Sequence, residues 1–337
     1  MKAAVFYGPH DVRVEERSIR EPGPDEVQIR VKAAGVCGTD LHIYEGAKGA
    51  TECNPPVVLG HEFAGVVEKV GANVAACQPG DHVTVDPNIS CYACDPCRSG
   101  KPHLCENLAA TGVNYDGGFA QLCNVLQKQV FLLPKELPFE VGAMCEPVGC
   151  CLHGIDLARI RTGDTVMIIG GGPIGLIMMQ LAAMAGAAKL ILVEPVPEKQ
   201  ALARKLGADL VIDPTAGDTR EALAAAGVKM VNVVIECVGR RETMLTAIDC
   251  AGRGGTALLF GLTPPDCEIP FMPFQAFQKE LTVTASFTNQ FTHGRAAGII
   301  SSGKLHLQEL ISNVLALDEI QKAFDMKVRT GKIIIKP

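Results

Sequence analysis

The chain has 337 residues, of which 47% are apolar, and its formal net charge is −6. This length exceeds what one ordinary hydrophobic core organises, so we expect two domains. The negative charge, with no basic stripe, argues against nucleic acid or an anionic membrane as a partner. A protein acting on a small molecule is favoured.

The N-terminal segment MKAAVFYGPHDVRVEE has only a short apolar run, too short for a secretory signal, so we expect a cytoplasmic protein. In a reducing compartment, 14 cysteines are metal ligands or buried apolar groups rather than disulfides. For Cys150 and Cys151 we favour packing over a strained redox pair. Packing is also predicted for Cys53, Cys77, Cys123, Cys237, Cys250 and Cys267.

Residues 1–147 are predicted to form a β-rich domain. Short alternating segments recur at 26–35, 62–71 and 81–85, and Gly and Pro separate them. That pattern is typical of barrel-like β folds.

A cysteine cluster within this domain predicts a metal site. Its spacing is C-x2-C-x2-C-x7-C, given by Cys91, Cys94, Cys97 and Cys105. Four thiolates around one tetrahedral zinc close the site, so this ion would hold a loop and not bind substrate. An iron–sulfur cluster is disfavoured, because the ferredoxin pattern has three residues before its last cysteine and a proline after it.

A second candidate metal site is dispersed along the chain. Cys37 lies in AGVCGTDLH, His61 and Glu62 in LGHEFAG, and Glu146 in CEPVG. A thiolate, an imidazole and a carboxylate make an acceptable zinc set with room for an exchangeable ligand. Periodicity alone would favour a packing role for each of these residues.

After about residue 148, strand-like and helix-like segments alternate. This rhythm indicates βαβ units and a parallel sheet over residues 148–283, with a Pro-rich loop at 262–275 within this range. Residues 166–188 are apolar enough to span a membrane, but Gly-Gly-Gly-Pro interrupts them after four residues, so strand–turn–helix is favoured. The last fifty residues are predicted to supply a strand at 281–287, helices near 295–303 and 318–326, and a final strand KIIIKP.

A glycine turn in TVMIIGGGPIG predicts dinucleotide binding. Gly170, Gly172 and Gly175 form G-x-G-x-x-G between a strand and a helix, with Pro173 and Ile174 inside the motif. The helix N-terminus then offers free N–H groups to a pyrophosphate. A glycine-rich turn without a nucleotide is the structural alternative.

Glu194 ends the next strand, 19 residues after Gly175, where a carboxylate binds ribose hydroxyls and repels a 2′-phosphate. NAD is therefore expected over NADP, although Lys199 could reach a phosphate. Val238 and Gly261, after two later strands, complete the predicted cofactor contacts.

Taken in order, GVCGTDLH, the Gly-His-Glu of 60–62, the four-cysteine segment, EPVG and the glycine turn resemble the zinc-dependent medium-chain dehydrogenases over essentially the whole chain. The resemblance is strongest to the polyol (sorbitol-like) and threonine dehydrogenase branches. It implies a GroES-like catalytic domain over 1–147, resumed by 284–337, around a Rossmann domain at 148–283. It also implies two zinc ions per chain, an alcohol substrate and a homodimer or homotetramer.

The same resemblance implies roles for individual residues. Cys37, His61 and Glu146 would lie at the catalytic zinc, with Glu62 as an exchanging or alternative ligand. Thr39 would take the proton of the substrate hydroxyl, and His42 would pass it to solvent. From the residues alone, Thr39 could instead cap a helix near Asp40, and His42 could be a surface histidine.

The substrate is left open by the sequence. Segment 284–291 reads TASFTNQF, without the Arg-Tyr pair that animal sorbitol dehydrogenases often place near the polyol. Tyr44, Phe119 and Asn289 are candidate pocket residues and suit a polyol, a sugar acid or threonine. The alternatives are butanediol dehydrogenase-like activity, a zinc-stabilised NAD-binding sensor, or a zinc-free quinone reductase, which would need neither ligand set.

Overall fold

The computed structural model describes residues 1–47, 52–326 and 330–337. These fall into two compact units, residues 1–149 with 290–337 (unit 1) and residues 150–289 (unit 2). Among the described helices, none is both long and apolar enough to cross a membrane. Residues 166–188 form a strand and a helix, as the glycine turn predicts.

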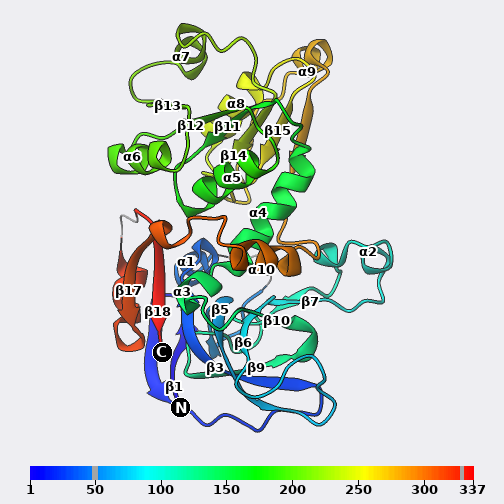
Figure 1. Cartoon of the computed structure of the whole chain (residues 1–337), viewed down its shortest axis with the longest axis vertical. Helices are drawn as coiled ribbons and strands as arrows, with labels where there is room; N and C mark the ends of the chain where they lie inside the picture. Colours follow the sequence, from blue (N-terminus) through cyan, green and yellow to red (C-terminus); the bar gives the residue numbers. More distant parts are fainter. Residues whose placement is uncertain (48–51, 327–329) are drawn as a thin grey trace. The chain divides into compact units, whose positions relative to one another are not determined.

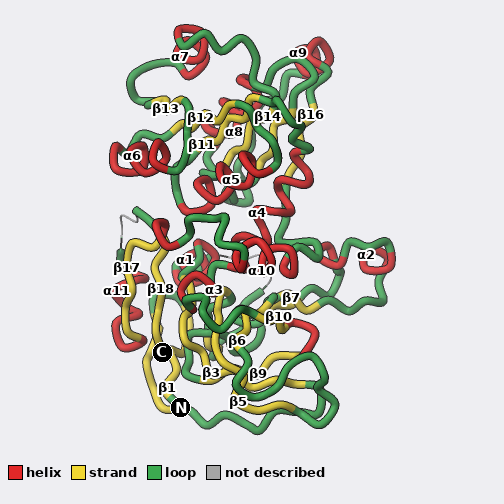
Figure 2. Tube along the Cα trace, in the orientation of Figure 1, coloured by secondary structure: helices red, strands yellow, loops and turns green. Residues whose placement is uncertain are grey.

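Unit 1 is mostly strand and loop with short helices (Figure 2). Its largest sheet has the order β10-β6-β5-β3-β18-β17, with β9 also paired to β3, and a second sheet has the order β2-β1-β4. The strands of unit 1 are β1 (Lys2–Gly8), β2 (Asp11–Glu16), β3 (Glu26–Gly35), β4 (Val57–Val58), β5 (Glu62–Val70), β6 (His82–Val85), β7 (Asn88–Ile89), β8 (Ala109–Ala110), β9 (Leu122–Leu126), β10 (Val130–Leu132), β17 (Ile311–Ala316) and β18 (Lys332–Lys336).

The helices of unit 1 follow or connect these strands. They are α1 (Gly38–Tyr44), α2 (Asp95–Arg98), α3 (Phe139–Gly142), α10 (His293–Ser301) and α11 (Ile320–Asp325), with short 3₁₀ turns at 102–104, 127–129, 308–310 and 317–319. Helix α4 (Cys145–Ala158) runs across the division between the units.

Strand β3 shows why these residues form a sheet around one core. Val27, Ile29 and Val31 are buried, whereas Arg30 and Lys32 point outward, which is the period-two pattern of a half-buried strand. Two register shifts occur in its pairing with β5, and beyond them Gly35 lies opposite Glu62. On its other side, Gly35 pairs with Ile334 of β18. The ends of β3, β5 and β18 therefore meet at one place.

Unit 2 contains a parallel sheet of order β13-β12-β11-β14-β15-β16 (Figure 1). The order reverses between β11 and β14, which is the switch point where open α/β sheets bind ligands. Its elements are β11 (Thr165–Ile169), α5 (Pro173–Met184), β12 (Lys189–Val193), α6 (Pro197–Lys205), β13 (Leu210–Ile212), α7 (Thr219–Ala225), β14 (Val233–Glu236), α8 (Arg241–Cys250), β15 (Thr256–Leu259), α9 (Pro273–Lys279) and β16 (Thr282–Ala285). The doubly wound sheet expected from the alternating rhythm is confirmed.

The division of the chain differs from the sequence expectation at its second boundary. A boundary at 283/284 would cut through β16, which pairs along its whole length with β15 as the sixth strand of the sheet. Unit 2 consequently continues to residue 289. The segment 262–275 is a loop as expected until Pro273, which starts α9 at a position where proline is tolerated.

Candidate metal and nucleotide sites

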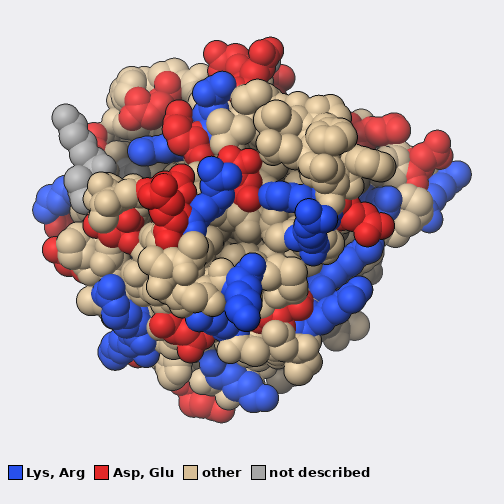
Figure 3. Space-filling model, turned by 90° about the horizontal axis from the view of Figure 1, so that it is seen from above, with Lys and Arg blue, Asp and Glu red and all other residues tan. Residues whose placement is uncertain are grey.

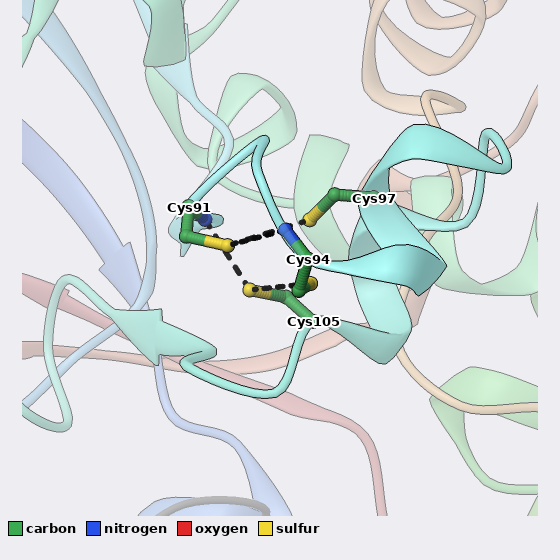
Figure 4. A group of neighbouring side chains, drawn as sticks. All are labelled: Cys91, Cys94, Cys97 and Cys105. Atoms are coloured by element: carbon green, nitrogen blue, oxygen red, sulfur yellow. Dashed lines mark hydrogen bonds between the residues drawn. The ribbon is translucent and has the colours of Figure 1, made fainter.

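The four cysteines of the segment 91–105 converge as the spacing predicts (Figure 4). The Sγ atoms of Cys91 and Cys97 are 4.0 Å apart, and those of Cys94 and Cys105 are 3.9 Å apart. Tetrahedral zinc with Zn–S bonds of about 2.3 Å requires sulfur–sulfur distances of roughly 3.8 Å. The four sulfurs therefore fit one zinc ion with no position left open.

Backbone amides around the cluster favour thiolates. The N–H groups of Ala93 and Cys94 donate to Cys91 Sγ and lower the pKa of Cys91 to about 6. Desolvation and the neighbouring thiols raise the pKa of Cys97 to about 12. Without a cation the cluster cannot hold four negative charges, so zinc binding would release protons from it.

The second metal set is built where β3 ends and β5 begins. Ligand atoms of Cys37, His61 and Glu62 all lie within 4.8 Å of one another. Cys37 is the N-cap of α1, and Glu62 is the first residue of β5. His61 and Glu62 are buried, whereas Cys37 is half-buried.

Asp40 contacts both Cys37 and His61, although its sequence position suggested only a helix start. Its fully buried carboxylate accepts a hydrogen bond from the Cys37 N–H (2.8 Å) and lies 3.4 Å from His61 Nδ1. A histidine oriented by a carboxylate on one ring nitrogen offers the other nitrogen to a metal. The available signal was the C-x-x-D spacing, which resembles a capping box at the start of a helix.

The charge state of His61 also fits a cation site. Burial alone would lower the pKa of His61, but Asp40 and Cys37 together raise it well above its ordinary value. The pocket between these two acids thus favours a positive charge, and a metal bound there would replace the proton.

Glu62 is held by a cation from the far end of the chain. Lys332, the buried first residue of β18, forms an ion pair with the Glu62 carboxylate. A Cβ atom at Gly35 would clash with this carboxylate and with Lys332 Cε, so any other residue there would have to displace the buried ion pair. Lys332 carries no sequence signal of this role, because nothing local distinguishes it from any other strand lysine.

Glu146 takes a different position from the other predicted ligands. It is buried in the first turn of α4 and is not among the atoms grouped within 4.8 Å of Cys37 and His61. Glu146 still acts electrostatically on Lys332. Burial alone would lower the pKa of Lys332, but the negative charges of Glu62, Cys37 and Glu146 together raise it. Direct ligation by Glu146 stays a prediction.

The two predicted relay residues lie on α1. Thr39 is half-buried and His42 is exposed, three residues further along the helix, so both lie on one helical face. Thr39 is not the N-cap, since the helix begins at Gly38 and is capped by Cys37. The alternative role of Thr39 as a cap is therefore wrong.

The glycine turn in unit 2 has the shape that a pyrophosphate requires. Gly170 has a φ of +104°, and a Cβ at Gly175 would overlap the Gly170 carbonyl, so the turn is tight. A Cβ at Gly172 would meet nothing within 4 Å, which leaves space at the N-terminus of α5. Pro173 and Ile174 open that 12-residue helix. Backbone amides and an open approach together fit a dinucleotide phosphate.

Glu194 directly follows β12 and stabilises this turn through hydrogen bonds. Its buried carboxylate accepts hydrogen bonds from Gly171 N–H (2.6 Å) and Val196 N–H (2.9 Å). A fixed negative charge therefore lies beside the glycine turn. Lys199 is half-buried on α6, five residues later.

A second buried carboxylate organises the next turn. Glu236 ends β14 and accepts hydrogen bonds from Val238 N–H (2.8 Å) and Gly239 N–H (2.9 Å). Gly261 N–H bonds the Glu236 carbonyl, so the predicted contacts Val238 and Gly261 lie side by side at the carboxyl ends of β14 and β15. The run VVIE followed by CVG, a strand that ends in a carboxylate before a glycine turn, is the local sequence signal for Glu236.

The three candidate pocket residues are all buried. Tyr44 and Phe119 belong to the buried core of unit 1, where both contact Phe324. Tyr44 OH also accepts a hydrogen bond from Gln321. A role for either residue at the substrate stays a prediction. Asn289 is buried in unit 2.

Two family profiles match this chain. "Alcohol dehydrogenase GroES-like domain" matches residues 23–135, and "Zinc-binding dehydrogenase" matches residues 173–300.

Curated proteins match over nearly the full length. The protein named Probable D-xylulose reductase A of Aspergillus fumigatus is 34% identical, with 97% of this chain and 93% of that protein covered. The L-threonine 3-dehydrogenase of Pyrococcus abyssi is 35% identical, with 99% and 97% covered. Among solved structures, a zinc-binding dehydrogenase of Sinorhizobium meliloti with bound NADP is 41% identical and has a TM-score of 0.96. The match covers 100% of this chain and 99% of that chain.

Proposed function

Since the chain belongs to the zinc-dependent medium-chain dehydrogenases, which are NAD(P)-linked alcohol dehydrogenases, we propose that it oxidises a secondary alcohol of a polyol or sugar-derived substrate to a ketone with NAD. The observation that carries this proposal is the set of half-buried Cys37 with buried His61 and Glu62, in which Cys37 lies two residues before Thr39 along the chain. A sensor or structural protein would need neither an open metal site nor a proton acceptor beside it. A threonine or butanediol dehydrogenase-like activity is the alternative within the same chemistry.

The residues of this chain have three tasks in this mechanism: they bind the metal, orient the ligand histidine and move the proton. Cys37, His61 and Glu62 would hold zinc, and Asp40 fixes the ring of His61. Zinc would supply Lewis acidity at the substrate oxygen, and the nicotinamide would accept the hydride. Thr39 accepts the proton of the substrate hydroxyl, and the exposed His42 delivers it to solvent.

A substrate screen tests the activity. Purified protein is incubated with NAD at alkaline pH and xylitol, sorbitol, L-threonine or 2,3-butanediol, and NADH absorbance is followed. We expect turnover with at least one polyol. The Cys37→Ser variant should lose both turnover and the metal at this site, whereas full turnover after that loss would contradict the zinc mechanism.

The relay is tested by the pH profile of the His42→Ala variant. Removing an exposed proton carrier should slow turnover most at low pH, where little solvent base is present. Added imidazole should restore the rate. A profile unchanged from the wild type would show that His42 has no relay role.

Glu194 supports NAD over NADP. Its carboxylate is already fixed by two backbone amides and would face a 2′-phosphate as an uncompensated like charge. The bound NADP of the Sinorhizobium meliloti protein makes this preference worth testing directly. We expect kcat/KM to be higher with NAD than with NADP. The Glu194→Gln variant should have a smaller ratio of kcat/KM with NAD to kcat/KM with NADP. A wild type that prefers NADP would contradict the assignment.

We further propose that the chain forms a homodimer through β16. This strand is at the edge of the unit 2 sheet, and three of its four residues are exposed. Strands of doubly wound sheets are normally covered on both faces. Nearby, Met272, Phe274 and Phe277 are 60%, 69% and 80% exposed. An open edge beside exposed aromatic groups suits antiparallel pairing with a second copy about a two-fold axis.

Light scattering on matched edge-strand variants tests the dimer. Val283→Lys on β16 should give a monomer, because two lysines would face each other across the axis. Val314→Lys makes the same change on β17, the edge of the unit 1 sheet, where Val314 is 47% exposed. It should leave the mass unchanged. A monomeric wild type, or loss of mass only in the β17 variant, would contradict this interface.

A further inference from the structure

Unit 2 holds a cavity of about 500 Å³ away from the glycine turn. It is lined by α7, by the ends of α8 and α9, and by the segments that lead into β14 and β15. All six strands are parallel, so this is the amino edge of the sheet, and the glycine turn lies at the carboxyl edge. A strand of four or five residues separates the two edges by roughly 13–17 Å.

The cavity is strongly basic for an acidic protein. Four cationic residues line it, and Asp249 is the one carboxylate among the lining residues. The cations are Arg220, Lys229, Arg253 and Lys279. The chain as a whole has 31 Lys and Arg against 37 Asp and Glu, so this local excess opposes the overall balance. Lys and Arg are interspersed with Asp and Glu over the face of the molecule that Figure 3 shows.

Two of the cations already have structural roles. Lys279 Nζ donates to the carbonyls of Asp249 (2.8 Å) and Ala251 (2.9 Å), which closes the end of α8. Arg220 lies 3.8 Å from Asp218, a weak exposed pair. Lys229 and Arg253 are both exposed, and in the described part of the chain neither has a hydrogen bond or ion pair. They are available to a ligand.

The floor of the cavity is apolar. Leu223, Val231 and Ala251 are buried at its base. Cys250 lies there too, and burial raises its pKa to about 11 although Arg220 and Lys279 act in the opposite direction. A ligand that fills this space would therefore combine a small apolar group with negative charge at the rim.

We propose that this cavity binds a small organic phosphate at a site separate from the cofactor. Its volume falls within the range of about 300–1,000 Å³ that small-molecule sites occupy. Lys229 and Arg253 bind the phosphate oxygens, and the apolar floor accepts the organic group. Phosphate is favoured over a carboxylate because a dianion matches two uncommitted cations.

Phenyl phosphate is a suitable probe, since it joins a dianion to one apolar ring. Binding is measured by isothermal titration calorimetry on the full chain, with and without saturating NADH. We expect binding in both conditions, weakened by salt, and no comparable binding of neutral benzamide. Competition by NADH would place the probe in the nucleotide site and overturn the proposal.

Matched variants locate the site. Lys229→Gln with Arg253→Gln should weaken phenyl phosphate binding by about tenfold or more, since each charge-assisted contact contributes that order. Arg204→Gln with Lys205→Gln removes two cations from the last turn of α6, outside the cavity. That control should bind as the wild type does. No binding by the wild type, or equal loss in both double variants, would overturn the proposal, and it would do so without affecting the dehydrogenase assignment.

Discussion

At the scale of single residues, Asp40 is the group whose loss should separate metal binding from folding. In the Asp40→Asn variant the Cys37 N–H keeps an acceptor, but His61 loses the adjacent charge. Loss of such a partner lowers metal affinity by about 10–100-fold. We expect the variant to fold, to retain the zinc of the four-cysteine segment, and to lose the other zinc and its activity to mild chelation.

Asp218→Asn is the matched control for that change. Asp218 also accepts backbone N–H groups at a helix start, from Arg220 and Glu221 at the N-terminus of α7, and it contacts neither predicted metal set. Metal content measured by mass spectrometry should be unchanged in this variant. If Asp40→Asn kept both metals under the same chelation, Asp40 would be no more than a helix cap.

Gly35 makes a second prediction at this scale. In Gly35→Ala the new methyl group must displace the Glu62 carboxylate or Lys332. Such overpacking costs about 1–3 kcal/mol in the free energy of unfolding, and the displaced Glu62 should also lower kcat. Gly298→Ala, on the exposed side of α10 with nothing within 4 Å, should instead stabilise the protein slightly. Urea unfolding compares the two, and equal stabilisation by both would show that the Glu62 region has spare room.

At the scale of elements, α10 begins with a buried histidine that should make folding sensitive to acid. Burial lowers the pKa of His293 to about 4, although Asp86 opposes this; Thr84 and Phe131 surround the ring. In the unfolded chain the group titrates near 6.5. Above pH 6.5 both states are neutral, and between 6.5 and 4 only the unfolded state takes up the proton. Stability therefore falls over that window, by roughly 3 kcal/mol in all.

The His293→Asn variant isolates that contribution. It should be less stable than the wild type at pH 7.5, because packing is lost, but its stability should fall less steeply between pH 6.5 and 4. His306→Asn changes an exposed histidine and should keep the wild-type slope. Urea unfolding at several pH values measures both. Parallel curves for wild type and His293→Asn would mean that folding does not lower the pKa of His293.

Elements were predicted better than the contacts between them. The strands at 26–35 and 62–71 and the helix from Pro173 were found within about a residue, because alternation and Gly or Pro mark them locally. The partnership of Lys332 with Glu62 depends on the pairing of β18 with β3, which no local pattern reports. Residue type alone also does not tell a core aromatic group from one that lines a pocket, and Tyr44 and Phe119 both lie in the core of unit 1.

At the scale of the whole molecule, the two metal sets predict that a chelator removes two zinc ions separately, with different effects. The set of Cys37, His61 and Glu62 leaves room for an exchangeable ligand, whereas four thiolates enclose the other ion. The wild type should contain about two zinc ions per chain. A chelator should first remove the ion at Cys37, and activity should fall with it while the thermal midpoint changes little.

Two cysteine variants test whether one zinc is catalytic and the other structural. Cys37→Ser should contain one zinc, lack activity and unfold near the wild-type temperature. Cys105→Ser should lose the other zinc, unfold at a lower temperature, and become open to trypsin at Arg98 or Lys101, because the zinc holds a segment with only a four-residue helix and short turns. A wild type with one zinc, or a Cys37→Ser variant that keeps both, would contradict the division into a catalytic zinc at Cys37 and a structural zinc at the four cysteines.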